Sequence, residues 1–418
     1  MRKLLFCLFV ICEVCFGHTP SLDFQVNRNM SLFYQVYFEE IATDVYEDLY
    51  EEIKNSFGTL SASDDERAEF IDNLTELEKA NYHHKYMTPN FMNLWTKASE
   101  SYDRKFDGDF EILSNRATEL REYSKKALEN PQLNFSAVFK FYDSDVRDNS
   151  QFKVYVCSTD KQSGIFAKAF GNNIVLKFNY GNRTADMCAI LEQVCHRLFQ
   201  TMKSNSNQAI KNYFLYNRSK NALPAYFLFD DVLAYAIGGL WTHSKLPSPH
   251  DSILPKPHNQ KIEIMANAIL QTVDNYLKNR KKIDEKLLEE YIKQFDIKFP
   301  KAHENYDAML TRITLIVENG IDIPECRNVI TSKFEIKEIL NEVGSYTTIF
   351  IGNNLGHPAL RTIQEKLPNL NSEFMFVTSD RTGKLFIVIK TNDMRKVALA
   401  IDNLKSQPAI VFGYTKEL

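Results

Sequence analysis

The chain has 418 residues, 44% of them hydrophobic, and a formal net charge of −4 with acidic and basic residues interspersed. This balance argues against a nucleic-acid-binding protein, because such proteins neutralise phosphates with an excess of Lys and Arg. The length exceeds what a single hydrophobic core supports and predicts roughly two or three domains.

Residues 1–17 are typical of a cleaved secretory signal peptide. Arg2 and Lys3 precede the apolar run "LLFCLFVIC", and Cys15-Phe16-Gly17 has the small-x-small pattern that signal peptidase cleaves. The run is too short to cross a bilayer, and no later segment is long and apolar enough to do so. We therefore expect a secreted or periplasmic protein without an integral membrane span, a buried N-terminal helix being the alternative.

Residues 18–132 are predicted to form a helical N-terminal domain. Apolar residues recur at helical spacing in "SLFYQVYFEEIATDVYEDLYEEIKNSFG", with Ser31 able to cap its start and Gly58 its end. Further helical patterns follow in "DDERAEFIDNLTELEKANYHHKY" and "FEILSNRATELREYSKKALEN". The region is acidic and rich in tyrosine, and it shows no strand pattern.

The pattern changes in residues 133–325, which are predicted to form a central α+β domain. "SAVFKFYDS", "FKVYVCST", "GIFAKAF" and "NNIVLKFNY" are typical of strands. A helix follows from about Thr184 through "DMCAILEQVCHRLFQTM", and a second apolar helix lies in "YFLFDDVLAYAIGGLW". Three more helices are expected near 258–280, 283–297 and 302–319. Strands followed by helices indicate a sheet with one face covered by helices.

Residues 326–418 are predicted to form a small ferredoxin-like α/β domain. The segments "YTTIFIGN", "HPALRTIQEKL", "EFMFVTSD", "GKLFIVIKT", "DMRKVALAIDNLK" and "PAIVFGY" give the order strand, helix, strand, strand, helix, strand. This topology occurs in proteins with many functions, so it predicts no activity.

The central helix carries the residues that could perform chemistry. Glu192 and His196 are four residues apart, which places both side chains on one face of a helix. Gln193 lies between them, and a second helix carries the acidic pair Asp230 and Asp231. Carboxylate oxygen and imidazole nitrogen are both accepted zinc ligands.

This arrangement resembles the active site of gluzincin-type zinc metallopeptidases. In that family an H-E-x-x-H helix supplies two His ligands and the general base, and a later helix supplies an acidic third ligand. Over roughly residues 150–320, Glu192 stands at the first His, Gln193 at the base, His196 at the second His, and Asp231 at the third ligand, with Asp230 as the alternative. An amide cannot accept a proton from metal-bound water, so Gln193 removes about a hundred- to ten-thousand-fold in rate.

The resemblance implies a zincin-like but catalytically inactive protein that binds a peptide or protein in the former substrate cleft, with strand 172–178 as the edge. No cofactor is expected under this hypothesis. A second hypothesis is an active metal-dependent hydrolase that keeps Glu192, His196 and Asp231 as zinc ligands and recruits another base. A third is a structural or adhesive secreted protein, and a fourth is an unrelated fold in which Glu192 and His196 form a local pair.

Two further features concern covalent chemistry. Beyond the signal peptide the chain has four cysteines, which allow either two disulfides or free buried thiols; Cys188 and Cys195 lie two turns apart on one helix and cannot bridge each other. The four are Cys157, Cys188, Cys195 and Cys326. The chain also has Asn-x-Ser/Thr sequons, which are glycosylation acceptors in a eukaryotic secretory protein. They begin at Asn29, Asn73, Asn134, Asn182 and Asn217.

Overall fold

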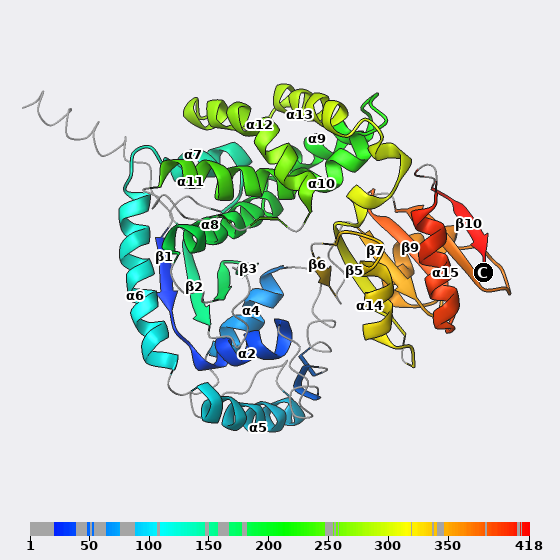
Figure 1. Ribbon diagram of the computed structural model, residues 1–418, viewed down its shortest axis with the longest axis horizontal. Helices are drawn as coiled ribbons and strands as arrows, with labels where there is room; N and C mark the ends of the chain where they lie inside the picture. The colour runs from blue at the N-terminus through cyan, green and yellow to red at the C-terminus, as the bar shows by residue number, and fades with distance from the viewer. Residues whose placement is uncertain are drawn as a thin grey trace, which may run out of the picture.

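The protein is an α+β chain with two mixed β-sheets, each covered by helices (Figure 1). The computed structural model describes residues 21–38, 48–50, 52–53, 64–75, 88–106, 109–146, 150–157, 167–177, 182–246, 254, 256–257, 259–318, 320–336, 338–340, 347–380, 383–407, 410 and 412–418. The predicted signal peptide, residues 1–17, lies outside these ranges.

The first sheet has four strands in the order β1-β2-β4-β3. Strands β1 (Ser21–Gln25), β2 (Gln151–Cys157) and β4 (Asn173–Lys177) are parallel, and β3 (Ala167–Phe170) pairs antiparallel with β4. Strand β1 was not predicted, and it joins the N-terminal region to the central sheet. The prediction that segment 172–178 forms the edge is wrong, since β4 lies inside the sheet and β3 at its edge.

The predicted N-terminal helices cover one face of this sheet. Helices α2 (Arg28–Phe38), α4 (Asp64–Thr75) and α5 (Pro89–Phe106) share a core cluster with side chains from β2, β3 and β4. Phe91 and Trp95 stack at 5.5 Å within this cluster. The N-terminal helices therefore share a core cluster with strands that follow residue 132.

The opposite face of the sheet carries α8 (Arg183–Gln200), on which α7 (Phe135–Tyr142) packs, while α6 (Asp109–Leu128) packs along β1 (Figure 1). The strand predicted in "SAVFKFYDS" is wrong, because these residues form α7. Most of its side chains are buried, and a short apolar run fits a buried helix as well as a buried strand.

The second apolar helix is longer than expected and runs without a break from Ala222 to Lys245. It consists of α10 (Ala222–Ala234), a π-helical segment η1 (Tyr235–Trp241) and α11 (Thr242–Lys245). At 24 residues it is long and apolar enough to cross a membrane, contrary to the sequence prediction, but 89% of its most apolar window is buried inside the protein. Such burial is typical of a core helix. It packs against α9 (Ser204–Leu215), α12 (Gln260–Lys278) and α13 (Glu285–Lys298).

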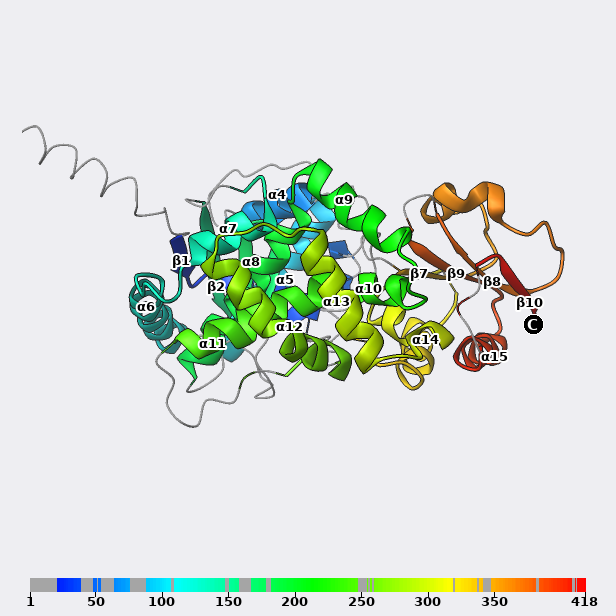
Figure 2. The same cartoon turned by 90° about the horizontal axis from the view of Figure 1, so that it is seen from above.

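The second sheet has six strands in the order β10-β8-β9-β7-β5-β6. Figure 2 shows β7, β9, β8 and β10 from above. They are β5 (Arg312–Val317), β6 (Glu338–Leu340), β7 (Thr347–Ile351), β8 (Phe374–Ser379), β9 (Leu385–Lys390) and β10 (Tyr414–Glu417). The helix predicted near 302–319 is wrong. Short 3-10 turns η2 (Ala302–Glu304) and η3 (Asp307–Leu310) precede β5, whose β-branched residues favour a strand. The C-terminal sheet thus begins at Arg312, before the expected boundary at 326.

Helices lie on both faces of the second sheet. One face packs against α14 (Ile323–Thr331) and α15 (Met394–Lys405), and the other against the 3-10 segment η4 (Pro358–Lys366). In a ferredoxin-like sheet the fourth strand lies beside the first. Here the last strand, β10, lies beside β8, and β5 takes the place next to β7. The strand order therefore differs from the predicted topology, and so does the layering, because a ferredoxin-like domain carries its helices on one face of its sheet. The α+β class is as expected.

Asp143, at the end of α7, links α7 to residues that precede or begin other helices. Asp143 adopts a left-handed conformation with φ 48° and accepts hydrogen bonds from Lys203 Nζ at 3.1 Å and Ser206 Oγ at 2.8 Å. Lys282 Nζ lies 2.8 Å from the same carboxylate. These contacts lower the pKa of Asp143 from 3.8 to about 2, and the hydrogen bond from Lys282 has the largest effect.

We expect Asp143→Asn to lower the free energy of unfolding at pH 7 by about 1–2 kcal/mol, since Asn tolerates the same backbone conformation but cannot hold the lysines. A lowered pKa stabilises the folded state above the unfolded pKa, and this contribution disappears as the pH falls through the folded pKa. Urea unfolding between pH 7 and about pH 2 checks this. A difference from the wild type that stays constant down to the acid end would contradict it.

Candidate functional site

Helix α8 positions the residues that the sequence singles out. Its start is capped by Asn182, whose Oδ1 accepts the backbone N–H of Ala185 at 3.0 Å. Its apolar side chains pack into the core, and His196 is only 5% exposed. The helix lies close to η1 because Gly238 has no side chain: a Cβ there would lie 2.3 Å from the Cα and N atoms of Glu192. This close approach brings Glu192 next to the long apolar helix.

The other predicted ligands, Glu192 and Asp231, and the alternative Asp230 all lie around the imidazole of His196. Its Nε2 lies 3.9 Å from Glu192 Oε1 and 3.8 Å from Asp231 Oδ1. Its Nδ1 is 3.0 Å from Asp230 Oδ1, at hydrogen-bonding distance. Within the described part of the chain, Nε2 has no hydrogen-bond partner. The two aspartates therefore occupy different places: Asp230 lies at Nδ1 and Asp231 faces Nε2.

Sequence reasoning missed a fifth member of this cluster, Arg312. Its Nη2 donates to Asp231 Oδ1 at 2.8 Å, and its Nη1 lies 3.4 Å from Asp230 Oδ2. The side chain is 16% exposed and enters from the first residue of β5. Because segment 302–319 was predicted as a helix, nothing in the sequence placed this guanidinium near α10. The β-branched run after Arg312 was the signal that could have shown otherwise.

The cluster is arranged as a buried ion-pair network. Asp231 Oδ1 faces both His196 Nε2 and the guanidinium of Arg312. A metal ion bound by this oxygen would lie close to the positive charge of the Arg312 guanidinium. Among the residues that the structure describes, no group of three or more His, Cys, Asp or Glu side chains has an arrangement suited to a metal ion. A planar guanidinium bridging two carboxylates already supplies the positive charge that a metal would bring.

Gln193 points to the edge of the sheet and not to His196. Its Oε1 accepts the backbone N–H of Ala169, on β3, at 3.2 Å. The Gln193 side-chain oxygen therefore accepts the N–H that the backbone carbonyl of a further strand would accept if it paired with β3. Gln193 thus caps a backbone N–H of the edge strand β3.

The four described cysteines are free and buried, so of the two predicted alternatives the structure has free thiols and not disulfides. Burial raises the pKa of the Cys157 thiol to about 12 and that of Cys326 to about 11. Burial also raises the pKa of Cys195, the neighbour of His196. These groups are protonated at physiological pH and are poor nucleophiles.

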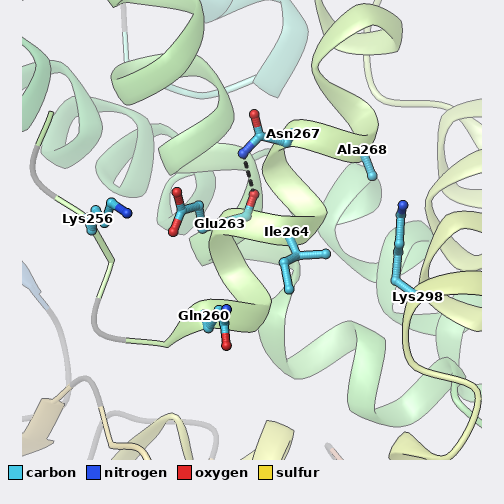
Figure 3. Close-up of a pocket in the computed structure, with 7 residues that line it drawn as sticks. All are labelled: Lys256, Gln260, Glu263, Ile264, Asn267, Ala268 and Lys298. Carbon is cyan, nitrogen blue, oxygen red and sulfur yellow. Dashed lines mark hydrogen bonds between the residues drawn. The ribbon is translucent and has the colours of Figure 1, made fainter.

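A surface cavity of about 550 Å³ lies on α12 and does not include the cluster around His196 (Figure 3). Its lining residues are Lys256, Gln260, Glu263, Ile264, Asn267, Ala268 and Lys298. Asn267 Nδ2 donates to the backbone carbonyl of Glu263 at 2.8 Å, so this amide supports the helix. The cavity is open, and its two lysines are exposed.

The chain was also compared with known proteins. No family model matches it, and neither the curated proteins nor the solved structures contain a match.

Proposed function

We propose that the protein is an exported, catalytically inactive relative of gluzincin peptidases that binds an extended peptide along the open edge of β3. The observation that carries this proposal is the convergence of Glu192 and Asp231 on His196 Nε2, at 3.9 and 3.8 Å, from two separate helices. The i, i+4 spacing on α8 is enough to bring Glu192 next to His196, but it does not account for the position of Asp231, which lies on α10.

The geometry of His196 supports the zincin-like part of the proposal. Metal-ligating histidines usually bond a carboxylate through one ring nitrogen and turn the other to the metal. His196 has this division, with Asp230 at Nδ1 and the two other carboxylates facing Nε2. The mixed sheet with an antiparallel edge strand beside the helix is consistent with the same family.

Two residues support the inactive part of the proposal. Gln193 cannot accept a proton from water and is bonded to Ala169. Arg312 places a guanidinium on Asp231, the proposed third ligand. Arg312 and Gln193 thus replace the two components that a zinc hydrolase requires, namely the cation and the base.

The peptide-binding part is supported by the position of β3, which is the last strand of the first sheet among the described residues. The strand pairs with β4 on one side, and its Ala169 N–H is turned to a side chain on the other. An extended peptide recognised by backbone hydrogen bonds needs neither metal nor base. It would take the place of the Gln193 amide.

Hydrogen exchange tests this binding directly. Wild-type protein is mixed with overlapping synthetic 12-residue peptides that cover an unfolded model protein, and exchange at residues 167–170 is followed by mass spectrometry. We expect a subset of the peptides to slow exchange there. If peptides bind elsewhere on the chain, or none binds at millimolar concentration, the proposed function is wrong.

Gln193→Ala is expected to increase the affinity for such a peptide about fivefold, because the peptide no longer displaces a hydrogen bond worth about 1 kcal/mol. Gln208→Ala is the matched control, since Gln208 lies on the exposed face of α9 and bonds only Asn212 among the described residues. Isothermal titration measures both. An unchanged affinity in Gln193→Ala would exclude competition between the Gln193 amide and the peptide.

A metal-dependent hydrolase is the second candidate, favoured by the buried Nε2 of His196 that no described residue binds. Glu192, His196 and Asp231 would be its ligands. Elemental analysis of protein purified without chelator, beside His196→Ala, distinguishes the two candidates. Stoichiometric metal that disappears in His196→Ala would overturn the inactive reading. We expect no such metal in either protein.

A further inference from the structure

The chain contains sequons whose asparagines differ sharply in their surroundings. An N-linked oligosaccharide is attached at Asn Nδ2, so this atom must face solvent in the folded protein. Burial and hydrogen bonding of the five asparagines therefore separate acceptors from non-acceptors.

Asn29 and Asn73 are unsuitable as acceptors. Asn29 is 6% exposed; its Nδ2 donates to the carbonyl of Leu74 at 3.0 Å, and its Oδ1 accepts from Trp95 Nε1 at 3.2 Å. Asn73 lies inside α4 and is 7% exposed. An oligosaccharide on either side chain would have to displace packed helices.

Asn182 and Asn217 are partly buried and have local structural roles. Asn182 caps α8 through its Oδ1, and Asn217 Oδ1 accepts the backbone N–H of Ser219 at 2.9 Å. The Asn217 side chain also hydrogen-bonds Tyr213. Modification at either position would crowd a side chain that already orders the backbone.

Asn134 differs from the other four. It is exposed, it directly precedes α7, and its side chain makes no cap hydrogen bond. Its backbone is fixed, because its carbonyl accepts the N–H of Ala137 at 3.1 Å and both neighbours, Leu133 and Phe135, are buried. The side chain therefore projects from an ordered backbone into solvent, with the sequon residue Ser136 only half-buried.

We propose that Asn134 carries an N-linked oligosaccharide in the folded protein, an inference that rests on the export proposed above. The donor is a lipid-linked oligosaccharide pyrophosphate. A bond forms between Asn134 Nδ2 and the anomeric carbon of the first sugar, and the bond from that carbon to the pyrophosphate oxygen breaks. The lipid pyrophosphate leaves with the electron pair, and Nδ2 loses one proton.

The test separates glycosylation from native export. Residues 18–418 are expressed behind an unrelated, cleavable signal peptide in insect cells, so that entry into the secretory pathway does not depend on residues 1–17. Protein from the medium and from the lumenal fraction is treated with peptide N-glycosidase in heavy-oxygen water. Mass spectrometry then identifies each modified asparagine.

We expect the label at Asn134, no label at Asn29 or Asn73, and loss of one oligosaccharide mass in Asn134→Gln and Ser136→Ala. Ser136→Thr, which keeps the sequon, is expected to retain the modification. An unmodified Asn134 would overturn the proposal, and so would a mass unchanged in Ser136→Ala. Export of the native chain is measured separately with its own residues 1–17, so failure of export and failure of modification give different results.

Discussion

Replacing Arg312 with alanine is expected to lower the free energy of unfolding by about 3–5 kcal/mol, because it leaves buried carboxylates without their cation. Asp230 and Asp231 are 3% and 2% exposed, and the guanidinium contacts both. Urea denaturation at pH 7, followed by circular dichroism, measures the loss. Because β5 and α10 are joined by this contact, the C-terminal sheet is expected to unfold first in the variant.

A matched control is Lys405→Ala, which removes a surface ion pair with Asp307 at 2.7 Å. The lysine side chain is 41% exposed, and such pairs contribute about 0–1 kcal/mol. The double variant Arg312→Ala, Asp231→Asn should recover part of the loss, since it also removes one buried charge. If Arg312→Ala costs no more than Lys405→Ala, the cluster does not stabilise the fold.

Gly238→Ala is expected to destabilise the protein by about 3 kcal/mol, at the upper end of the usual cost of overpacking a core. The added methyl group would lie 2.3 Å from backbone atoms of Glu192, which cannot move without shifting α8. The same shift would move Glu192 relative to His196. Thermal and urea unfolding measure the stability.

Gly239→Ala provides a control at the adjacent position. Its Cβ would lie 3.0 Å from the ring of Tyr235, a side chain that can shift by a few tenths of an ångström. The better helix propensity of alanine, about 1 kcal/mol, offsets much of this contact. We expect a change within about 1 kcal/mol. Equal losses in the two variants would show that the backbone contact at Gly238 is not the cause.

The sequence predicted the elements whose pattern is local. The helix that carries Glu192 and His196 and the later helix that carries Asp231 both follow from apolar spacing. It failed at the short helix α7, whose buried apolar run also fits a strand, and at the two strands β1 and β5. Strand β1 is short and owes its conformation to pairing with β2, and β5 owes its conformation to β6 and β7.

The same limit applies to the candidate site. Helical spacing places Glu192 and His196 on one face, so that pair could be predicted from the sequence. The roles of Asp230 and Asp231 depend on how α10 is rotated against α8, which no local pattern encodes. Arg312 reaches the cluster only because β5 joins a sheet formed by later residues. A buried cation supplied by a distant strand leaves no motif in the sequence.

The export proposed above would give the long apolar helix from Ala222 to Lys245 a further consequence, during synthesis of the chain. It is long and apolar enough to be released sideways from a translocation channel into lipid. Asp230 and Asp231 lie near its middle, where an aspartate opposes insertion by about 2.5–3.5 kcal/mol. Under the proposed export, the pair that holds Arg312 in the folded protein would therefore also favour complete passage of this segment across the membrane.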